Sequence, residues 1–167
     1  KGFQGDDLSK ANTIAACAKH FAAYGAAIAG RDYAAVDMSE RALREVIFPP
    51  FKAALDAGVA TFMSSFNTIN GVPASGNAWL LNDVLRKEWG FKGFVVSDWN
   101  SLGEMMAHGN VESHYEVGLQ GIKAGVDMDM EGRIYISEVK KLLDDKKINI
   151  SQDRKSTRLN SSHRIRS

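Results

Sequence analysis

Residues 93–99 read Gly93-Phe94-Val95-Val96-Ser97-Asp98-Trp99, and this stretch decides the fold class. It is a short apolar run that opens on a glycine and turns polar abruptly at Ser97 and Asp98. Similar runs of strand length occupy residues 13–19, 59–65 and 124–129. Because these runs are continuous rather than alternating, they are typical of strands buried on both faces, as in a parallel sheet covered by helices.

Helical patterns separate the apolar runs. The first starts at Asp37, with Glu40 three residues on, and ends at Gly58, while the prolines at 49–50 predict a kink or two short helices. The second is capped by Asn77 and ends at Gly90. Two more are expected, one over residues 114–123 that ends at Gly125, and a charged terminal helix striped by Ile136, Val139, Leu142 and Leu143.

The resulting order alternates strand and helix four times, with roughly 30 to 45 residues from strand to strand, as in right-handed crossover connections. The predicted fold class is therefore α/β. Either a doubly wound sheet or part of a (β/α)8 TIM barrel fits this order. A complete barrel needs about 250 residues, so four units make at best half of one.

The composition is that of an ordinary soluble globular chain. Of the 167 residues, 44% are hydrophobic and 25% are charged, and no apolar run approaches the ~20 residues of a membrane helix. Residues 1–152 hold 16 basic and 19 acidic side chains, a net charge of −3, so no basic face points to nucleic acid. Cys17, the single cysteine, lies in an apolar run and is expected to be a buried thiol.

Residues 153–167 differ from the rest of the chain. They carry five basic residues and one acidic residue, show no periodicity, and resemble a translated sequencing adapter. A basic tail for nucleic-acid binding or targeting is the alternative. We therefore expect a folded domain over residues 1–152 and a non-native or disordered tail over residues 153–167.

Functional residues of either α/β architecture belong at the carboxyl ends of the strands. Asp98 directly follows its strand and is followed by the indole of Trp99. Such a pair suits a sugar, because the indole packs on apolar C–H faces while the carboxylate attacks the electron-poor carbon. Position alone supports this role and a simpler one equally; in the simpler role, Asp98 caps the next element.

The ends of the first two strands hold further candidates. Lys19 and His20 could hold adjacent hydroxyls of a sugar, although a surface lysine and a core histidine would give the same pattern. Lys19 also invites a Schiff-base aldolase interpretation, in which a desolvated amine attacks a carbonyl. Met63 and Phe66 are core residues by default, with a rim contact to a ligand as the alternative.

Other chemistries find no support in the sequence. The histidines show no metal-ligand spacing, and no glycine-rich phosphate loop follows a strand, so we expect neither a metal nor a cofactor. Asn70-Gly71 predicts a turn with positive φ. Arg31 beside Asp32 predicts an internal ion pair.

Taken together, these segments resemble glycoside hydrolase family 3, in particular its bacterial periplasmic-type β-glucosidases. The resemblance covers nearly all of residues 1–150 in family order. It is carried by Lys19-His20-Phe21-Ala22-Ala23-Tyr24-Gly25, Gly30-Arg31-Asp32-Tyr33, Asp37-Met38-Ser39-Glu40-Arg41, Ser65-Phe66-Asn67 through Gly76-Asn77, residues 85–93, and Val95-Val96-Ser97-Asp98-Trp99.

The resemblance implies that Asp98 is the nucleophile of a retaining glycosidase, which forms a covalent glycosyl-enzyme. It implies that Lys19 and His20 bind hydroxyls of the nonreducing sugar, and that Met63 and Trp99 lie near that ring. Phe66 matches a substrate-binding position where many relatives place tyrosine, and it lacks the hydroxyl that tyrosine would offer for a hydrogen bond.

The resemblance also implies a partial (β/α)8 barrel, about its C-terminal half, and a β-glucoside or oligosaccharide substrate. The acid/base would come from a following α/β-sandwich domain that this chain lacks, so the fragment is expected to be inactive alone. The residues after His20 favour a glucosidase or xylosidase over an N-acetylhexosaminidase, periplasmic or secreted by resemblance, with no nucleic-acid or membrane partner. A non-catalytic sugar-binding module and a Lys19 aldolase or lyase are the alternatives.

Overall fold

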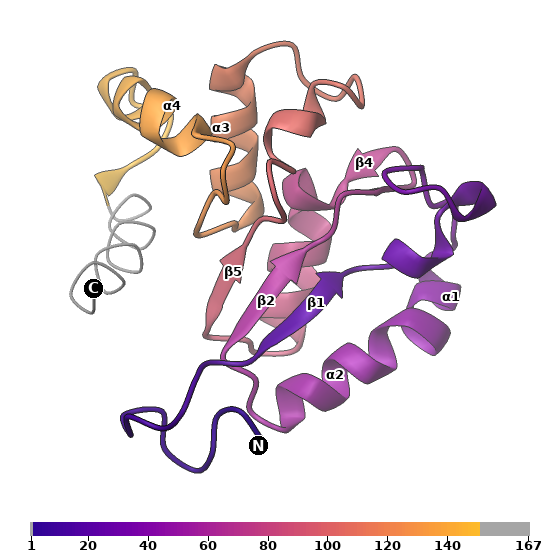
Figure 1. Ribbon diagram of the computed structural model, residues 1–167. Helices are drawn as coiled ribbons and strands as arrows, with labels where there is room; N and C mark the ends of the chain where they lie inside the picture. The colour runs from indigo at the N-terminus through magenta and orange to yellow at the C-terminus, as the bar shows by residue number, and fades with distance from the viewer. Residues whose placement is uncertain (1, 151–167) are drawn as a thin grey trace.

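The computed structural model describes residues 2–150, and the tail expected over residues 153–167 lies outside them. Three parallel strands form its central sheet in the order β1-β2-β5. Their bounds are Cys17–Phe21 for β1, Thr61–Ser64 for β2 and Phe94–Val96 for β5. Figure 1 shows the three arrows side by side and pointing the same way. The α/β class with a parallel sheet is therefore as predicted.

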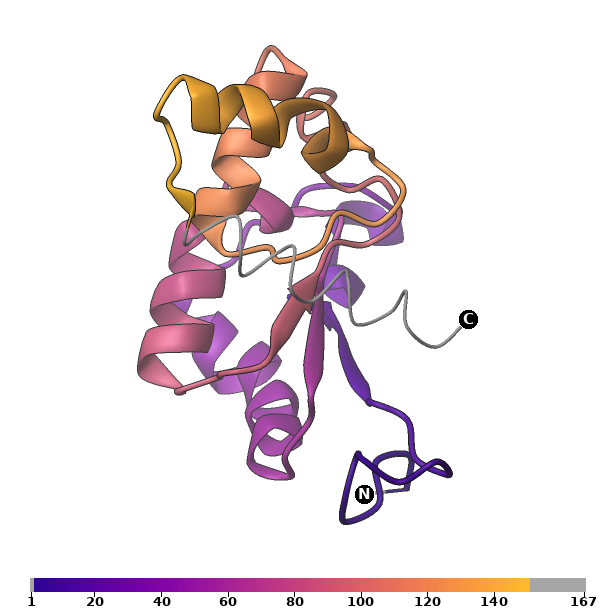
Figure 2. The ribbon, with the colours of Figure 1, turned by 90° about the vertical axis from the view of Figure 1, so that its left-hand side faces the viewer.

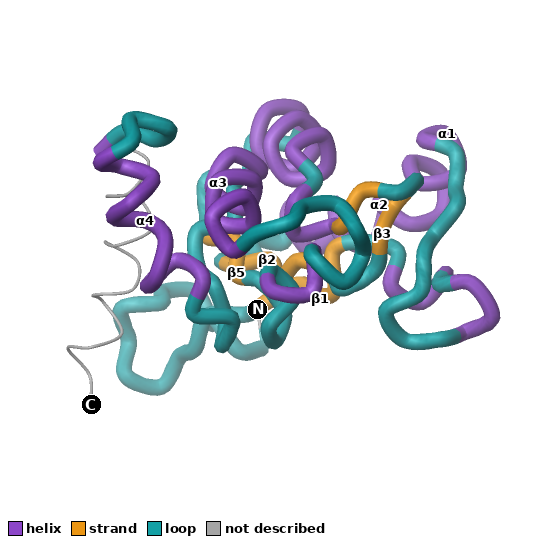
Figure 3. The backbone as a smooth tube through the Cα atoms, turned by 90° about the horizontal axis from the view of Figure 1, so that it is seen from above, coloured by secondary structure: helices purple, strands orange, loops and turns teal. Residues whose placement is uncertain are grey.

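Helices join the strands and lie outside them. The first connection contains α1 (Glu40–Ala42), a π-helical turn (Leu43–Ile47) and α2 (Phe48–Asp56). A π-helix over Trp79–Glu88 joins β2 to β5, and α3 (His114–Ala124) and α4 (Ile134–Asp144) follow β5. Figures 2 and 3 show these helices gathered as an arc on one side of the sheet. No helix of residues 2–150 is long and apolar enough to cross a membrane.

Shorter elements lie at the carboxyl end of the sheet. The 3-10 turns span Tyr24–Ala26, Ile28–Gly30, Ala74–Gly76 and Gly103–Met105. Two short strands, β3 (Thr68–Ile69) and β4 (Val72–Pro73), form an antiparallel hairpin. Its turn is the predicted Asn70-Gly71 pair, with φ values of 50° and 84°.

Burial alternates along β1 and β2, which corrects for these two strands the expectation that both faces of the sheet are covered, whereas Val95 and Val96 of β5 are both buried. In β2, Phe62 is fully buried whereas Thr61 and Met63 are partly exposed. The helical arc covers one face, and within residues 2–150 no helix covers the other. Cys17 of β1 lies on the uncovered side, so it is an exposed thiol and not the buried one predicted.

Aromatic rings fill the space between the sheet and the helices. The Phe62 ring centroid lies 5.4 Å from that of Phe21 and 4.9 Å from that of Phe91, both edge to face. Gly93 permits β5 to start close to β2, because a Cβ there would lie 2.2 Å from the carbonyl oxygen of Ala60. The glycine that opens the quoted stretch is thus required by a close backbone approach.

Two predicted strands differ from the observed ones. The first, expected over residues 13–19, is Cys17–Phe21, because pairing with β2 begins only at Cys17 opposite Thr61. The fourth, expected over residues 124–129, is reduced to a single bridge between Val96 and Met128. The Asp127 side chain accepts the Val95 N–H that a regular ladder would give to a backbone carbonyl.

Helix ends were predicted better than helix faces. Asn77 caps the second helix through the Leu80 N–H, and Gly58, Gly90 and Gly125 all end helices with positive φ. The prolines at 49–50 lie in the first turn of α2, which a π-helical turn separates from α1, so the second of the two predicted alternatives, two short helices, is found.

Two details of the helices were predicted wrongly. The first helix is capped by Ser39 and not by Asp37, because the Ser39 hydroxyl accepts the Ala42 N–H. Ile136 of the terminal helix is 86% exposed, and Tyr135 is buried in its place. Tyr135 is held there by a hydrogen bond from its hydroxyl to the Val126 carbonyl.

Candidate active site

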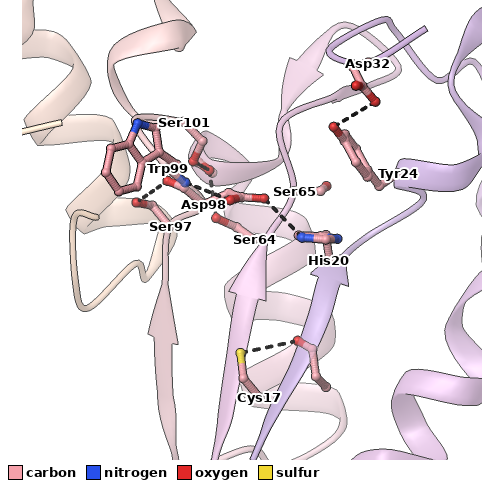
Figure 4. Close-up of polar contacts among 12 residues, drawn as sticks. Cys17, His20, Tyr24, Asp32, Ser64, Ser65, Ser97, Asp98, Trp99 and Ser101 are labelled. Atoms are coloured by element: carbon pink, nitrogen blue, oxygen red, sulfur yellow. Dashed lines mark hydrogen bonds and ion pairs between the residues drawn. The ribbon is translucent and has the colours of Figure 1, made fainter. Parts of the chain in front are cut away.

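Asp98 lies in the turn that follows β5, at the carboxyl end of the sheet (Figure 4). It is 9% exposed, and its Oδ1 accepts the Trp99 N–H at 2.7 Å. Its Oδ2 is buried and has no hydrogen-bond donor among the described residues. One oxygen of the carboxylate is thus held by a backbone hydrogen bond, whereas the other accepts none from the described residues.

Residues 128–130 are hydrogen-bonded to the turn that contains Asp98. The Met128 and Met130 carbonyls accept the N–H groups of Ser97 and Asn100 at 2.9 and 2.8 Å. The Ser97 hydroxyl donates to the Asp98 carbonyl and accepts the Met130 N–H. The segment that fails to form a fourth strand therefore fixes the backbone of the candidate nucleophile.

His20 provides the group nearest to the free carboxylate oxygen among the described contacts. Its Nε2 lies 3.4 Å from Asp98 Oδ2, and its side chain is 27% exposed. The Tyr24 ring lies against it, with centroids 5.2 Å apart, and the Tyr24 hydroxyl donates to Asp32 at 3.1 Å. Burial and this bond to Asp32 raise the pKa of Tyr24 to about 12. Asp32 thus pairs with Tyr24, and the predicted ion pair with Arg31 does not form among the described residues.

The other predicted residues are distributed around this pair. Lys19 is exposed on β1 and makes no side-chain hydrogen bond or ion pair within residues 2–150. Met63 is half-buried on β2, opposite Val96 of β5. Trp99 is 60% exposed beside Asp98. Phe66 packs edge to face on Tyr33 at 4.6 Å.

Sequence reasoning missed several neighbours of Asp98. Three buried serines, Ser64, Ser75 and Ser101, form a chain of hydroxyls near the site. Glu104, six residues after Asp98, has its pKa raised by burial and to a smaller extent by the Asp98 charge, with His108 opposing. No sequence pattern marks serines at these positions as neighbours of Asp98. The turn at residues 101–105, which brings Glu104 back toward Asp98, has no sequence signal either.

Two other aspartates of the fourth apolar run are structural. Asp127 is 3% exposed, pairs with Arg86 and accepts the Val95 N–H. Asp129 accepts the N–H of Ile134 at the start of α4, and burial raises its pKa. Within residues 2–150, no three His, Cys, Asp or Glu side chains are grouped as a metal ion would need.

Comparison with known proteins agrees with this arrangement. The model of the glycosyl hydrolase family 3 N-terminal domain matches residues 1–161. The periplasmic β-glucosidase of Salmonella typhimurium is 40% identical over 152 residues, which are 91% of this chain and 20% of that protein. A β-xylosidase of Formosa agariphila is 46% identical over 128 residues, 75% of this chain and 18% of that protein.

Solved structures give the same result. The β-glucosidase of Listeria innocua, whose structure in complex with glucose is known, superposes with a TM-score of 0.90 at 40% identity, over 93% of this chain and 22% of that one. The chain therefore spans about a fifth of the length of the relatives it matches. On the sequence match, the superposition and the parallel sheet that ends in Asp98, the chain belongs to glycosyl hydrolase family 3, within the N-terminal domain of that family.

Proposed function

We propose that the protein containing this chain hydrolyses β-glucosides from their nonreducing ends, with retention of configuration and with Asp98 as nucleophile. The observation that carries the proposal is the buried Oδ2 of Asp98, which has no hydrogen-bond donor within residues 2–150 and lies 3.4 Å from His20. The bond from the Trp99 N–H to Oδ1 orients the carboxylate without occupying the attacking oxygen.

The reaction has two balanced steps. In the first, Asp98 Oδ2 forms a bond to the anomeric carbon as the glycosidic C–O bond breaks, and an acid gives its proton to the leaving oxygen. In the second, the same group takes a proton from water, whose oxygen attacks the anomeric carbon and releases Asp98. Retention needs the acid/base to be a second carboxyl group that lies about 5 Å from the carboxyl of Asp98.

The acid/base is proposed to come from an α/β-sandwich domain outside this chain, so the chain alone is expected to be inactive. We further propose that residues 1–152 form about the C-terminal half of a (β/α)8 barrel. The parallel order β1-β2-β5 with helices on one side supports part of such a barrel. Because a relative that is 40% identical to this chain is a periplasmic β-glucosidase, a periplasmic or secreted location is proposed.

Sugar binding is proposed for the residues around Asp98. His20 and Lys19 would hold ring hydroxyls, since His20 lies beside the nucleophile and Lys19 is unpaired among the described residues. Trp99 would pack on the sugar face, because most of its indole is exposed next to the carboxylate. Met63 and Phe66 would border the ring, with Phe66 providing an apolar edge in place of a hydroxyl.

Covalent trapping tests the proposal. Full-length protein is incubated with a 2-deoxy-2-fluoro-β-glucoside carrying a good leaving group, and its peptides are analysed by mass spectrometry. Labelling of the peptide that contains Asp98, absent from Asp98→Asn, is expected. Binding of glucosides without any turnover or label would instead identify a sugar-binding module. Borohydride trapping on Lys19 would identify a Schiff-base enzyme, and a faster reaction with the 2-fluoroxyloside would identify a xylosidase.

A further inference from the structure

Three buried serine hydroxyls form a continuous hydrogen-bonded chain near the candidate site. Ser64 Oγ lies 2.7 Å from Ser75 Oγ, and Ser75 Oγ lies 2.7 Å from Ser101 Oγ. Their residues are 0%, 1% and 4% exposed. In the view of Figure 4, Ser64 and Ser101 are drawn on either side of Asp98. The three come from separate segments, so the chain joins parts of the fold that are distant in sequence.

Ser75, the central member, lies on a firmly held element. Its 3-10 turn, Ala74–Gly76, is bonded to α3 because Gln120 Nε2 donates to the Gly76 carbonyl at 3.1 Å. Asn110 in turn fixes Gln120 through a 2.7 Å bond to its Oε1. Packing is also tight, since a Cβ at Gly76 would lie 2.6 Å from a methyl carbon of Met105. Ser75 is therefore a fixed point for the two hydroxyls that it joins.

The outer members belong to the two segments that carry the site. Ser64 ends β2 and lies opposite Phe21, the residue after His20, in the sheet register. Ser101 follows Asp98 by three residues, and its N–H donates to the Asp98 carbonyl at 3.1 Å. The Ser64–Ser75 bond thus restrains the end of β2 beside His20, and the Ser75–Ser101 bond restrains the turn that contains Asp98.

We infer that the Ser64–Ser75–Ser101 chain is a positioning device that sets Asp98 against His20 for attack on the sugar. The inference rests on the proposed function. Hydroxyl bonds are directional, so two bonds to one fixed oxygen restrict both segments at once. Small displacements of a nucleophile are costly to the rate, because attack needs the reacting atoms close and aligned.

Burial alone does not explain the chain. Replacing both partners of a buried hydrogen bond by apolar groups of similar shape is often nearly neutral for stability. Three hydroxyls also carry three protons, and the two contacts between them use only two. Stability would be as well served by apolar side chains here, whereas orientation of the Asp98 turn requires the directional bonds.

The rate of covalent trapping by the 2-fluoroglucoside tests the inference in the full-length protein. Ser75→Ala removes both hydroxyl bonds and changes none of the residues proposed to contact the sugar. Because Asp98 is then positioned less precisely, the rate constant of trapping at saturation should fall about tenfold. The inhibitor concentration that gives half the maximal rate should stay the same, because the groups proposed to hold the sugar hydroxyls are unchanged. Ser101→Ala, which removes one link, should lower the rate constant less.

Ser137→Ala is the matched control, since its hydroxyl bonds to the Ile134 carbonyl on α4, away from Asp98. It should trap at the wild-type rate. If Ser75→Ala is trapped at the wild-type rate and only its melting temperature falls, the three serine hydroxyls contribute to stability alone. This outcome would overturn the inference. If Ser75→Ala does not fold, an unchanged rate in Ser101→Ala overturns it equally. Absence of trapping in the wild type would instead overturn the proposed function.

Discussion

At the scale of single residues, the carboxylates that follow the apolar runs differ in what surrounds their oxygens. Asp127 is paired with Arg86, and Asp129 caps the start of α4. Asp98 combines an oriented oxygen with a buried free one beside a histidine. Side chains of one type at similar sequence positions therefore serve an ion pair, a helix cap and, in our proposal, a nucleophile.

Asp98→Asn should abolish turnover in the full-length protein. Asparagine keeps the shape and the Trp99 contact but cannot form the glycosyl ester, so a loss on the order of 10⁴-fold or more in kcat is expected. Steady-state hydrolysis of an aryl β-glucoside measures it. Asp83→Asn, which removes only an exposed pair with Lys87, should retain wild-type activity. Comparable activity of the two variants would rule out Asp98 as nucleophile.

Tyr24 should resist ionisation at alkaline pH. Its folded pKa of about 12 lies above the ordinary value of 10.0, chiefly because of burial and the bond to Asp32. The neutral phenol is thus favoured in the fold, and this stabilisation is complete below pH 10.0 and is lost as the pH rises through about 12. At about pH 11, still below that pKa, the phenolate absorbance of the wild type should match that of Tyr24→Phe. A difference already developed at pH 10 would contradict the arrangement.

At the scale of elements, β5 and the helix before it are joined by the partly buried cation Arg86. Arg86, with a side chain 13% exposed, donates to the carbonyls of Gly93 and Gly125, each at 3.1 Å, and to Asp127. It thereby ties the start of β5 to the segment that supports the Asp98 turn. The helix is adjacent in sequence to β5, but its contact with residues 125–127 exists only in the folded chain.

Arg86→Ala should destabilise the domain severely. It leaves the Asp127 carboxylate buried without its cation, a change that costs about 3 to 5 kcal/mol. Arg86→Lys should recover only part of this, because an ammonium cannot reproduce the planar fork that reaches three acceptors. Urea unfolding of the full-length protein measures both.

Lys87→Ala is the adjacent control for Arg86. Its ion pair with Asp83 is exposed and spans one helical turn, so a change within about 0.5 kcal/mol is expected. Equal effects of the two alanine variants would show that the Arg86 contacts add nothing to stability.

At the scale of the whole molecule, the described residues form a sheet with helices on one face and an edge strand, β1, whose ladder partner among them is β2 alone. Several large apolar side chains are exposed, including Phe3 at 72% and Ile14 at 66%. Unpaired strand edges and apolar surface favour association between chains. The single-sided core is consistent with the chain spanning about a fifth of its relatives.

Expressed alone, the chain should therefore aggregate or remain molten. Size-exclusion chromatography, thermal unfolding by near-UV circular dichroism and binding of a hydrophobic dye check this. Large species, a broad transition and strong dye binding are expected. A soluble monomer with a sharp cooperative transition would mean that the three-stranded core is sufficient by itself.

The amino-acid sequence by itself determined the features that depend on local chemistry. Apolar runs located β2 and β5 to within a residue or two, and glycines with positive φ ended the helices where they were expected. The motifs of residues 19–99, taken together and in order, suggested the family. Such signals are short-range, because a strand's side-chain pattern and a helix cap are set by neighbouring residues.

Only the tertiary structure decided the features that depend on partners distant in sequence. It moved the first strand to residues 17–21, reduced the fourth to one bridge, and exposed Cys17, because pairing and cover are supplied by other segments. It also brought His20 to Asp98 and assembled the three serines near them. Contacts across 11 to 78 residues have no local signal, since they arise only when parallel strands bring their carboxyl ends to one edge.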